Sequence, residues 1–94
     1  MINSHNSLKL VKMYQKTRDE KYLNLIRDYY SETIEKCKVL YALDDNQVDK
    51  TIFILCSRMD VQQGYAFSTL LKYYLREPSK LESYQPQVLD IQPY

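Results

Sequence analysis

The sequence predicts an all-α fold, in which a compact domain of three to four helices is followed by an extended C-terminal tail. The 94 residues contain one glycine and three prolines, too few for a β-sandwich, which needs turn residues at about every 8–12 positions. Apolar residues instead recur every three or four positions, as on the buried face of a helix. The 45% of apolar and 27% of charged residues are typical of one globular domain.

The first helix is expected over residues 7–15, where Leu8, Val11 and Tyr14 lie on one face. The four residues from Thr17 to Glu20 then have the form of a capping box. In that motif the Thr17 hydroxyl accepts a hydrogen bond from the Glu20 N–H, and the Glu20 carboxylate accepts one from the Thr17 N–H. The motif predicts that a second helix begins here.

The second helix is expected to run unbroken to about Leu43 and to be the central scaffold of the domain. Its apolar stripe is predicted to comprise Tyr22, Ile26, Tyr29 or Tyr30, Ile34, Cys37, and Leu40 or Tyr41. The segment from Asp44 to Gln47 ends this helix and starts the next, because Asp and Asn are preferred N-caps and favour the positive end of the helix dipole.

The third helix is expected over about residues 46–59, and the fourth from Tyr65 or Phe67 to Glu77, where Pro78 ends it. The third is predicted to pack through Val48, Ile52, Leu55, Cys56 and Met59. The inward residues of the fourth are predicted to be Phe67, Leu70, Leu71, Tyr74 and Leu75. Its outward residues are then Thr69, Lys72, Tyr73 and Arg76.

These elements divide the chain into a helical domain over residues 1–78 and a tail over residues 79–94. The tail contains two prolines and no periodic pattern, which favours an extended conformation. It either stays open or docks on the domain through Leu81, Tyr84, Val88, Leu89 and Ile91.

Charge and composition exclude several classes of protein. A net charge of +1, from 13 basic and 12 acidic residues, lacks the basic excess of a free-standing nucleic-acid-binding protein. Cys37 and Cys56 are too few and too far apart for a disulfide framework or a zinc site, and are predicted to be buried thiols. No apolar run approaches the about 20 residues of a membrane span, and the N-terminus lacks the apolar region of a signal peptide, so a cytoplasmic protein is expected.

Enzymatic chemistry has little support in the sequence. The only histidine, His5, is close to the chain end, and no phosphate-binding glycine loop, nucleophile elbow or metal-ligand spacing is present. We therefore expect no catalytic activity, no cofactor and no metal. Asp44, Asp45 and Asp49 could hold a cation, but helix capping is the simpler interpretation. Glu32 with Lys36 and Glu35 with Lys38 are expected to be ion pairs on a solvated helix face.

Residues 64–76, GYAFSTLLKYYLR, resemble the promoter-opening segment of bacterial sigma factors. That segment reads Gly-Tyr-x-Phe-Ser-Thr and continues to an aromatic pair, an aliphatic residue and an arginine. The matching residues are Gly64, Tyr65, Phe67, Ser68, Thr69, Tyr73, Tyr74, Leu75 and Arg76, with Asp60 at the start of the loop. The similarity covers about residues 7–77, the region-two domain that binds the polymerase clamp and melts the −10 element.

The resemblance implies two binding surfaces. Melted single-stranded DNA is held by aromatic rings on which bases stack and by cations near the phosphates, and the resemblance implies this role for Tyr65, Thr69, Lys72, Tyr73, Tyr74 and Arg76. For Tyr74, a place in the core remains the alternative. The polymerase-facing signature Asp-Leu-x-Gln-Glu aligns with residues 46–50, which implies contacts through Asn46, Gln47, Asp49, Lys50 and Phe53.

Four residues depart from the family pattern. Leu70 replaces the tyrosine that stacks on a flipped adenine, Glu77 brings a carboxylate towards the duplex, and Pro78 ends the helix early. On the polymerase-facing helix, Lys50 reverses the charge of the family's glutamate. These departures keep a second interpretation open, in which the fold is retained and promoter binding is lost.

The sequence therefore predicts a small sigma-like transcription regulator. It would act with RNA polymerase core and a separate partner that recognises the −35 element, or modulate polymerase from a phage or mobile element. Promoter DNA would then be bound only within the complex. The alternative is a protein-interaction module with a sigma-like fold that binds a regulatory protein through its tyrosines.

Overall fold

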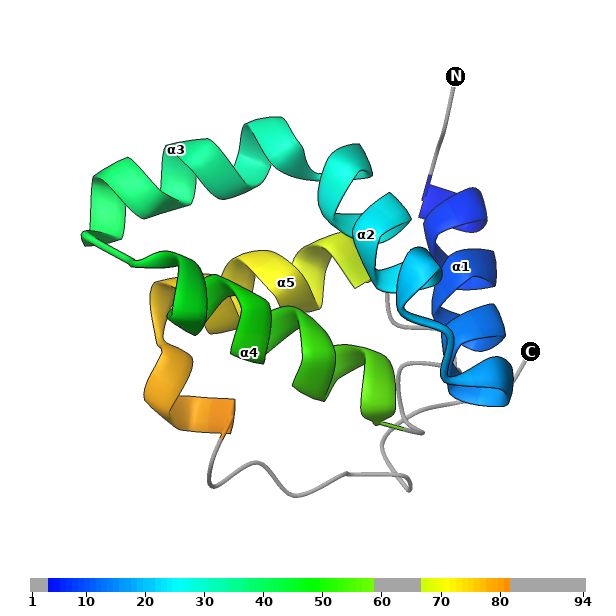
Figure 1. Cartoon of the computed structure of the whole chain (residues 1–94). Helices are drawn as coiled ribbons and strands as arrows, with labels where there is room; N and C mark the ends of the chain where they lie inside the picture. Colours follow the sequence, from blue (N-terminus) through cyan, green and yellow to red (C-terminus); the bar gives the residue numbers. More distant parts are fainter. Residues whose placement is uncertain (1–3, 59–66, 82–94) are drawn as a thin grey trace.

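Five α-helices and one short 3₁₀ helix make up the part of the chain that the structure describes (Figure 1). The computed structural model describes residues 4–58 and 67–81, with side chains from residue 7 onward. The elements are α1 (Ser4–Thr17), α2 (Glu20–Tyr29), α3 (Ser31–Tyr41), α4 (Asp45–Ser57), α5 (Phe67–Arg76) and the 3₁₀ helix η2 (Pro78–Leu81). No strand occurs among these residues, so the all-α prediction is confirmed.

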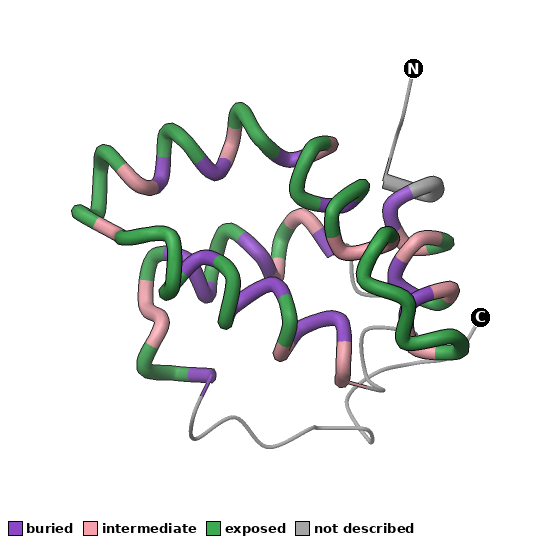
Figure 2. The backbone as a smooth tube through the Cα atoms, viewed as in Figure 1, coloured by how far each residue is buried: buried purple, intermediate pink, exposed green. Residues whose placement is uncertain are grey.

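Helices α4 and α5 lie at the centre of the molecule. Each contacts the other, α1 and η2, while α3 packs across α5 and α1 packs mainly on α2 (Figure 1). Their inward faces form one apolar core, seen as the buried segments in Figure 2. The core residues are Val11, Tyr14, Ile26, Tyr30, Ile34, Cys37, Val48, Ile52, Leu55, Cys56, Phe67, Leu71, Tyr74, Leu75 and Leu81. The central place expected for the second helix is thus taken by α4 and α5.

The expected long second helix is divided in two at Tyr30. This residue has φ −96° and ψ 13°, outside the helical region, although its N–H still bonds the Ile26 carbonyl at 3.0 Å. The change of direction buries the Tyr30 ring 5.6 Å from the ring of Phe67. It also lets the Tyr30 hydroxyl donate to Ser7 Oγ at 2.8 Å. The prediction of one unbroken helix is therefore wrong, because burial of this tyrosine requires the bend.

The bend has a second consequence at the end of α3. Ile26, Tyr30, Ile34 and Cys37 are buried as the stripe predicts. The predicted burial of Leu40 or Tyr41 is wrong, since Leu40 is 72% and Tyr41 38% exposed. The α3 axis carries its last turn beyond the core, so the last pair of the predicted stripe faces solvent instead.

The two expected capping sites have different outcomes. Thr17 is the last residue of α1, and its hydroxyl donates to the Met13 carbonyl at 2.9 Å, so the predicted capping box is wrong. Asp19 caps α2 instead, by accepting from the Lys21 N–H at 3.0 Å. At α4 the prediction is confirmed, and Asp44 forms a reciprocal capping box with Gln47.

The remaining elements largely follow the sequence pattern. The buried residues of α4 are Val48, Thr51, Ile52, Leu55 and Cys56, of which Thr51 is an addition to the prediction. The inward and outward faces of α5 are those expected, with Leu70 half-buried. Leu81 is buried, and its carbonyl accepts from Arg58 Nη2 at 3.2 Å, whereas Met59, Tyr65, Tyr84, Val88, Leu89 and Ile91 lie outside the described residues.

Within residues 4–58 and 67–81, no helix has both the length and the apolar character that a membrane span requires.

Candidate nucleic-acid interface

The outer face of α5 brings together four of the residues expected to contact DNA. Phe67, Leu71, Tyr74 and Leu75 are buried, and the helical period therefore turns the remaining positions towards solvent. Thr69, Lys72, Tyr73 and Arg76 are all exposed. The Arg76 guanidinium carbon lies 5.6 Å from the centre of the Tyr73 ring, within cation–π range. One aromatic ring and two cations thus share this face.

Tyr74 does not belong to the face. Its side chain is 3% exposed and packs in the core. Its ring meets that of Tyr73 edge-on, with centroids 4.8 Å apart and planes at 78°. The expectation that Tyr74 contacts DNA is therefore corrected in favour of the core alternative. Its buried ring supports the exposed ring of Tyr73 through the edge-on contact. Tyr65 lies outside the described residues.

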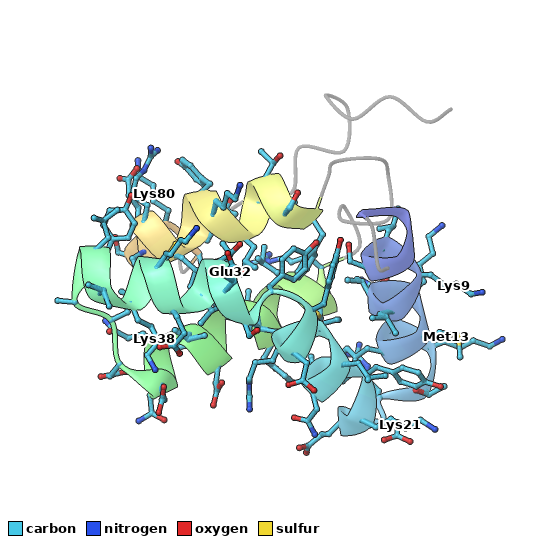
Figure 3. All side chains as sticks on the ribbon, turned by 90° about the horizontal axis from the view of Figure 1, so that it is seen from above. Lys9, Met13, Lys21, Glu32, Lys38 and Lys80 are labelled. Atoms are coloured by element: carbon cyan, nitrogen blue, oxygen red, sulfur yellow. The ribbon has the colours of Figure 1, made fainter. Side chains whose placement is uncertain are left out.

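A groove runs between the α5 face and the end of α3. It has a volume of about 440 Å³ and is lined by Lys36, Cys37, Leu40, Tyr41, Thr69, Lys72, Tyr73 and Arg76. Figure 3 shows the two helices side by side, with Lys38 on the side of α3 away from α5. The groove therefore combines cations from both helices with two partly exposed tyrosine rings.

The charge of this groove is positive. Lys36, Lys72 and Arg76 line it, and no carboxylate is among its lining residues. Glu32 lies 3.6 Å from Lys36 and Glu77 lies 3.6 Å from Arg76, so both carboxylates flank the groove. These pairs are largely solvent-exposed and contribute little to holding the cations in place.

The sequence pattern missed the α3 side of the groove. Lys36 was expected only as half of an ion pair, and Leu40 and Tyr41 only as alternative core residues. Their helical spacing gives no indication of a neighbouring α5, because contact between these helices depends on the bend at Tyr30.

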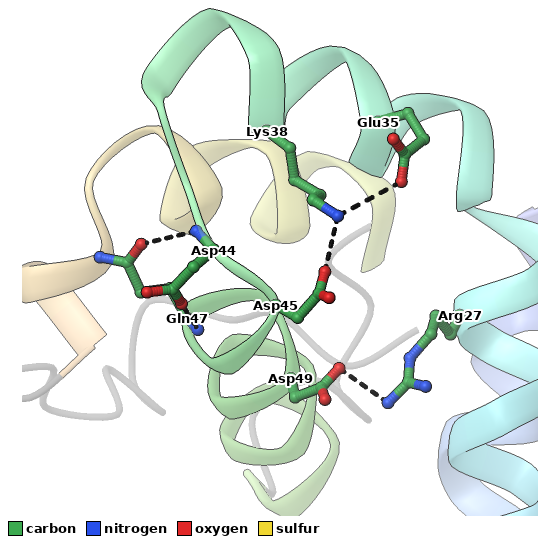
Figure 4. A network of polar contacts seen from close by, with 7 residues as sticks. All are labelled: Arg27, Glu35, Lys38, Asp44, Asp45, Gln47 and Asp49. Atoms are coloured by element: carbon green, nitrogen blue, oxygen red, sulfur yellow. Dashed lines mark hydrogen bonds and ion pairs between the residues drawn. The ribbon is translucent and has the colours of Figure 1, made fainter.

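The second expected surface, on α4, is also solvent-facing. Its five residues are exposed: Asn46, Gln47, Asp49, Lys50 and Phe53. Gln47 is engaged in the capping box, and Asp49 Oδ1 lies 2.7 Å from Arg27 Nη2 (Figure 4). Phe53 is 49% exposed and rests edge-on against Tyr14. It is therefore an exposed apolar side chain on this face.

The aspartates near the start of α4 each have a separate structural role. Asp44 caps the helix, Asp45 Oδ1 accepts from Lys38 Nζ at 2.6 Å, and Asp49 pairs with Arg27 (Figure 4). The hydrogen bond from Lys38 holds the pKa of Asp45 below its ordinary value. Among the described residues, no group of three His, Cys, Asp or Glu is placed to hold a metal. Helix capping therefore accounts for Asp44, and the contacts with Lys38 and Arg27 account for Asp45 and Asp49.

Both cysteines are buried and free, as predicted. Burial raises the pKa of the Cys56 thiol to about 12, so it stays protonated at neutral pH. Both thiols are buried, whereas reactive thiols are at least partly exposed.

Comparison with known protein families, with curated proteins and with solved structures found no match. The resemblance to sigma factors consequently rests on the residues quoted above.

Proposed function

We propose that this chain is a small transcription regulator that resembles the −10-recognition domain of a sigma factor. It acts in the cytoplasm with RNA polymerase core and a separate partner that recognises the −35 element. The observation that carries this proposal is the exposed α5 face, where Lys72, Tyr73 and Arg76 lie together beside a positively charged groove.

The chemistry of that face suits melted DNA better than duplex DNA. A tyrosine ring backed by a second ring offers a stacking surface to an unpaired base, and the adjacent cations can approach the phosphates. The net charge of +1 supplies little long-range attraction to a duplex. Binding within a polymerase complex, where the strand is already separated, fits both properties.

The exposed α4 face is the proposed polymerase contact. Phe53 supplies an apolar anchor, and the polar residues Asn46, Asp49 and Lys50 precede it on the exposed side of the same helix. An exposed apolar side chain next to polar residues is typical of protein–protein interfaces.

Co-purification with purified core polymerase tests this proposal. The intact chain should be retained on core, and Phe53→Ser should reduce retention by about tenfold or more, because the anchor is lost. The matched control is Leu25→Ser, which changes a 46% exposed leucine on α2 that is outside both surfaces. Lack of retention of the intact chain, or equal retention of both variants, would overturn the polymerase assignment.

One observation favours the alternative, a protein-interaction module that has lost promoter binding. Glu77 places a carboxylate at the end of α5, within 3.6 Å of Arg76 and 4.0 Å of Lys80. A negative charge there opposes approach of a phosphate backbone. If the alternative holds, the chain will bind neither core polymerase nor promoter DNA with a melted −10 element, even after Glu77→Gln.

A further inference from the structure

Three consecutive residues at the end of α3 present apolar surface to solvent. Val39 is 84%, Leu40 72% and Tyr41 38% exposed, and we call these residues the α3 ridge. Tyr73, at 36% exposed, lies across the groove from Leu40 and Tyr41. Single exposed apolar side chains are ordinary, but Leu40, Tyr41 and Tyr73 line one groove together, and such a group of exposed apolar side chains marks an interaction site.

Nucleic acid does not account for this ridge. Bases stack on the faces of aromatic rings, and the aliphatic side chains of Val39 and Leu40 offer none. Aliphatic side chains are instead covered by the apolar face of a protein partner, where their burial contributes to affinity. The ridge therefore points to a protein ligand.

The positive charge of the groove beside the ridge indicates which kind of protein partner would bind there. Lys36, Lys72 and Arg76 line the adjoining groove, and Glu32 and Glu77 only flank it. A symmetric pair of copies would bring the same three cations of both chains together, which disfavours self-association through this surface. An acidic partner matches the groove.

We propose that the α3 ridge and the groove dock an acidic amphipathic helix of another protein. Its apolar side chains cover Leu40 and Tyr41, and its carboxylates meet Lys72 and Arg76. This inference does not depend on the proposed promoter function. Since Tyr73 and the same cations form the candidate nucleic-acid surface, the helical partner and a DNA strand would exclude each other.

The test is selection of binders from a phage-displayed random peptide library on the intact chain. Selected peptides should be rich in Asp and Glu around Leu, Phe or Trp at helical spacing. A fluorescein-labelled synthetic copy of the leading peptide is then titrated by anisotropy. Leu40→Ser should weaken its binding about tenfold or more, Lys72→Glu should also weaken it, and Leu25→Ser should leave it unchanged.

Several outcomes would overturn the inference. They are the absence of enriched peptides, enrichment of basic peptides, and binding that Leu40→Ser leaves unchanged. A dimer in sedimentation that Leu40→Ser dissociates would assign the ridge to a second copy. If Leu40→Ser weakened binding of an oligo(dT) probe as much as it weakened the peptide, the ridge would belong to the nucleic-acid surface instead.

Discussion

Replacement of Tyr73 by alanine is the most direct test of the α5 face. The change removes the exposed ring that Arg76 covers at 5.6 Å and leaves the buried ring of Tyr74 in place. Because Tyr73 projects from the outer face of α5, its loss opens no cavity in the core. The expected effect on folding is limited to its contacts with the two neighbours, about 1–2 kcal/mol.

The expected loss of DNA affinity is as large as the loss of folding stability, or larger. One base–ring stack contributes about 1–3 kcal/mol, so its removal should weaken binding about 5- to 150-fold. Tyr73→Phe keeps the ring and loses only the hydroxyl, so it should retain most of the affinity. The two variants therefore separate stacking from hydrogen bonding at one position.

The assay is a fluorescence titration of fork DNA, with a single-stranded −10 segment, against core polymerase that carries each variant. Circular dichroism at the assay temperature verifies that both variants are folded. Equal affinity of Tyr73→Ala and the unaltered chain would refute the stacking role of this face. Equal loss in Tyr73→Ala and Tyr73→Phe would refute the claim that the ring itself is the contact.

Three further predictions concern the stability of the fold. Leu71→Ala should lower the free energy of unfolding in urea by about 2–5 kcal/mol, because Leu71 is 0% exposed; Thr69→Ala, on the exposed side of α5, should change it by less than about 0.5 kcal/mol, and similar values for the two would contradict the assigned faces of α5. Asp44→Ala removes the capping box of α4 and should cost about 0.5–2 kcal/mol, visible as a lower thermal midpoint; an unchanged midpoint would show that the cap contributes nothing. Burial raises the pKa of the Tyr30 hydroxyl above its ordinary value of 10.0, so the stability linked to this group is fully present below about pH 10 and falls as the pH rises through the raised value. Tyr30→Phe cannot ionise and should remove that part of the alkaline loss in pH-dependent unfolding, while losing the hydrogen bond to Ser7 at about 1–3 kcal/mol; an identical alkaline slope would contradict the burial of this hydroxyl.

Local features of the chain were predictable from residue order alone. The apolar residues of α5 recur at helical spacing, so its buried and exposed faces follow from the period of the helix. The start of α4 follows from Asp44 and Gln47, which meet across a single turn. The pair of Glu32 and Lys36, 3.6 Å apart, follows from the four-residue separation of its members on one helix.

The wrong prediction at Thr17 has a local cause, whereas the wrong prediction of an unbroken second helix depends on contacts between distant segments. Thr17 and Glu20 satisfy the capping pattern, but the Thr17 hydroxyl bonds back into α1 and Asp19 takes the cap. The stripe of the second helix continues unbroken in the sequence, and only the packing of Tyr30 against Ser7 and Phe67 requires a bend. A residue pattern records which side of a helix is apolar, but not which neighbour that side meets.

The sequence by itself determined the all-α fold of the described residues, the faces of α4 and α5, and the shared face of Lys72, Tyr73 and Arg76. The tertiary structure decided between the core and the DNA surface for Tyr74, and it alone decided that the end of α3 projects beyond the core. It also joined α3 to α5 across one groove, whose two sides are more than 25 residues apart in the chain. The physical reason is that helix periodicity is set by neighbours within a turn, whereas the direction of each helix is set by the side chains it buries against other helices.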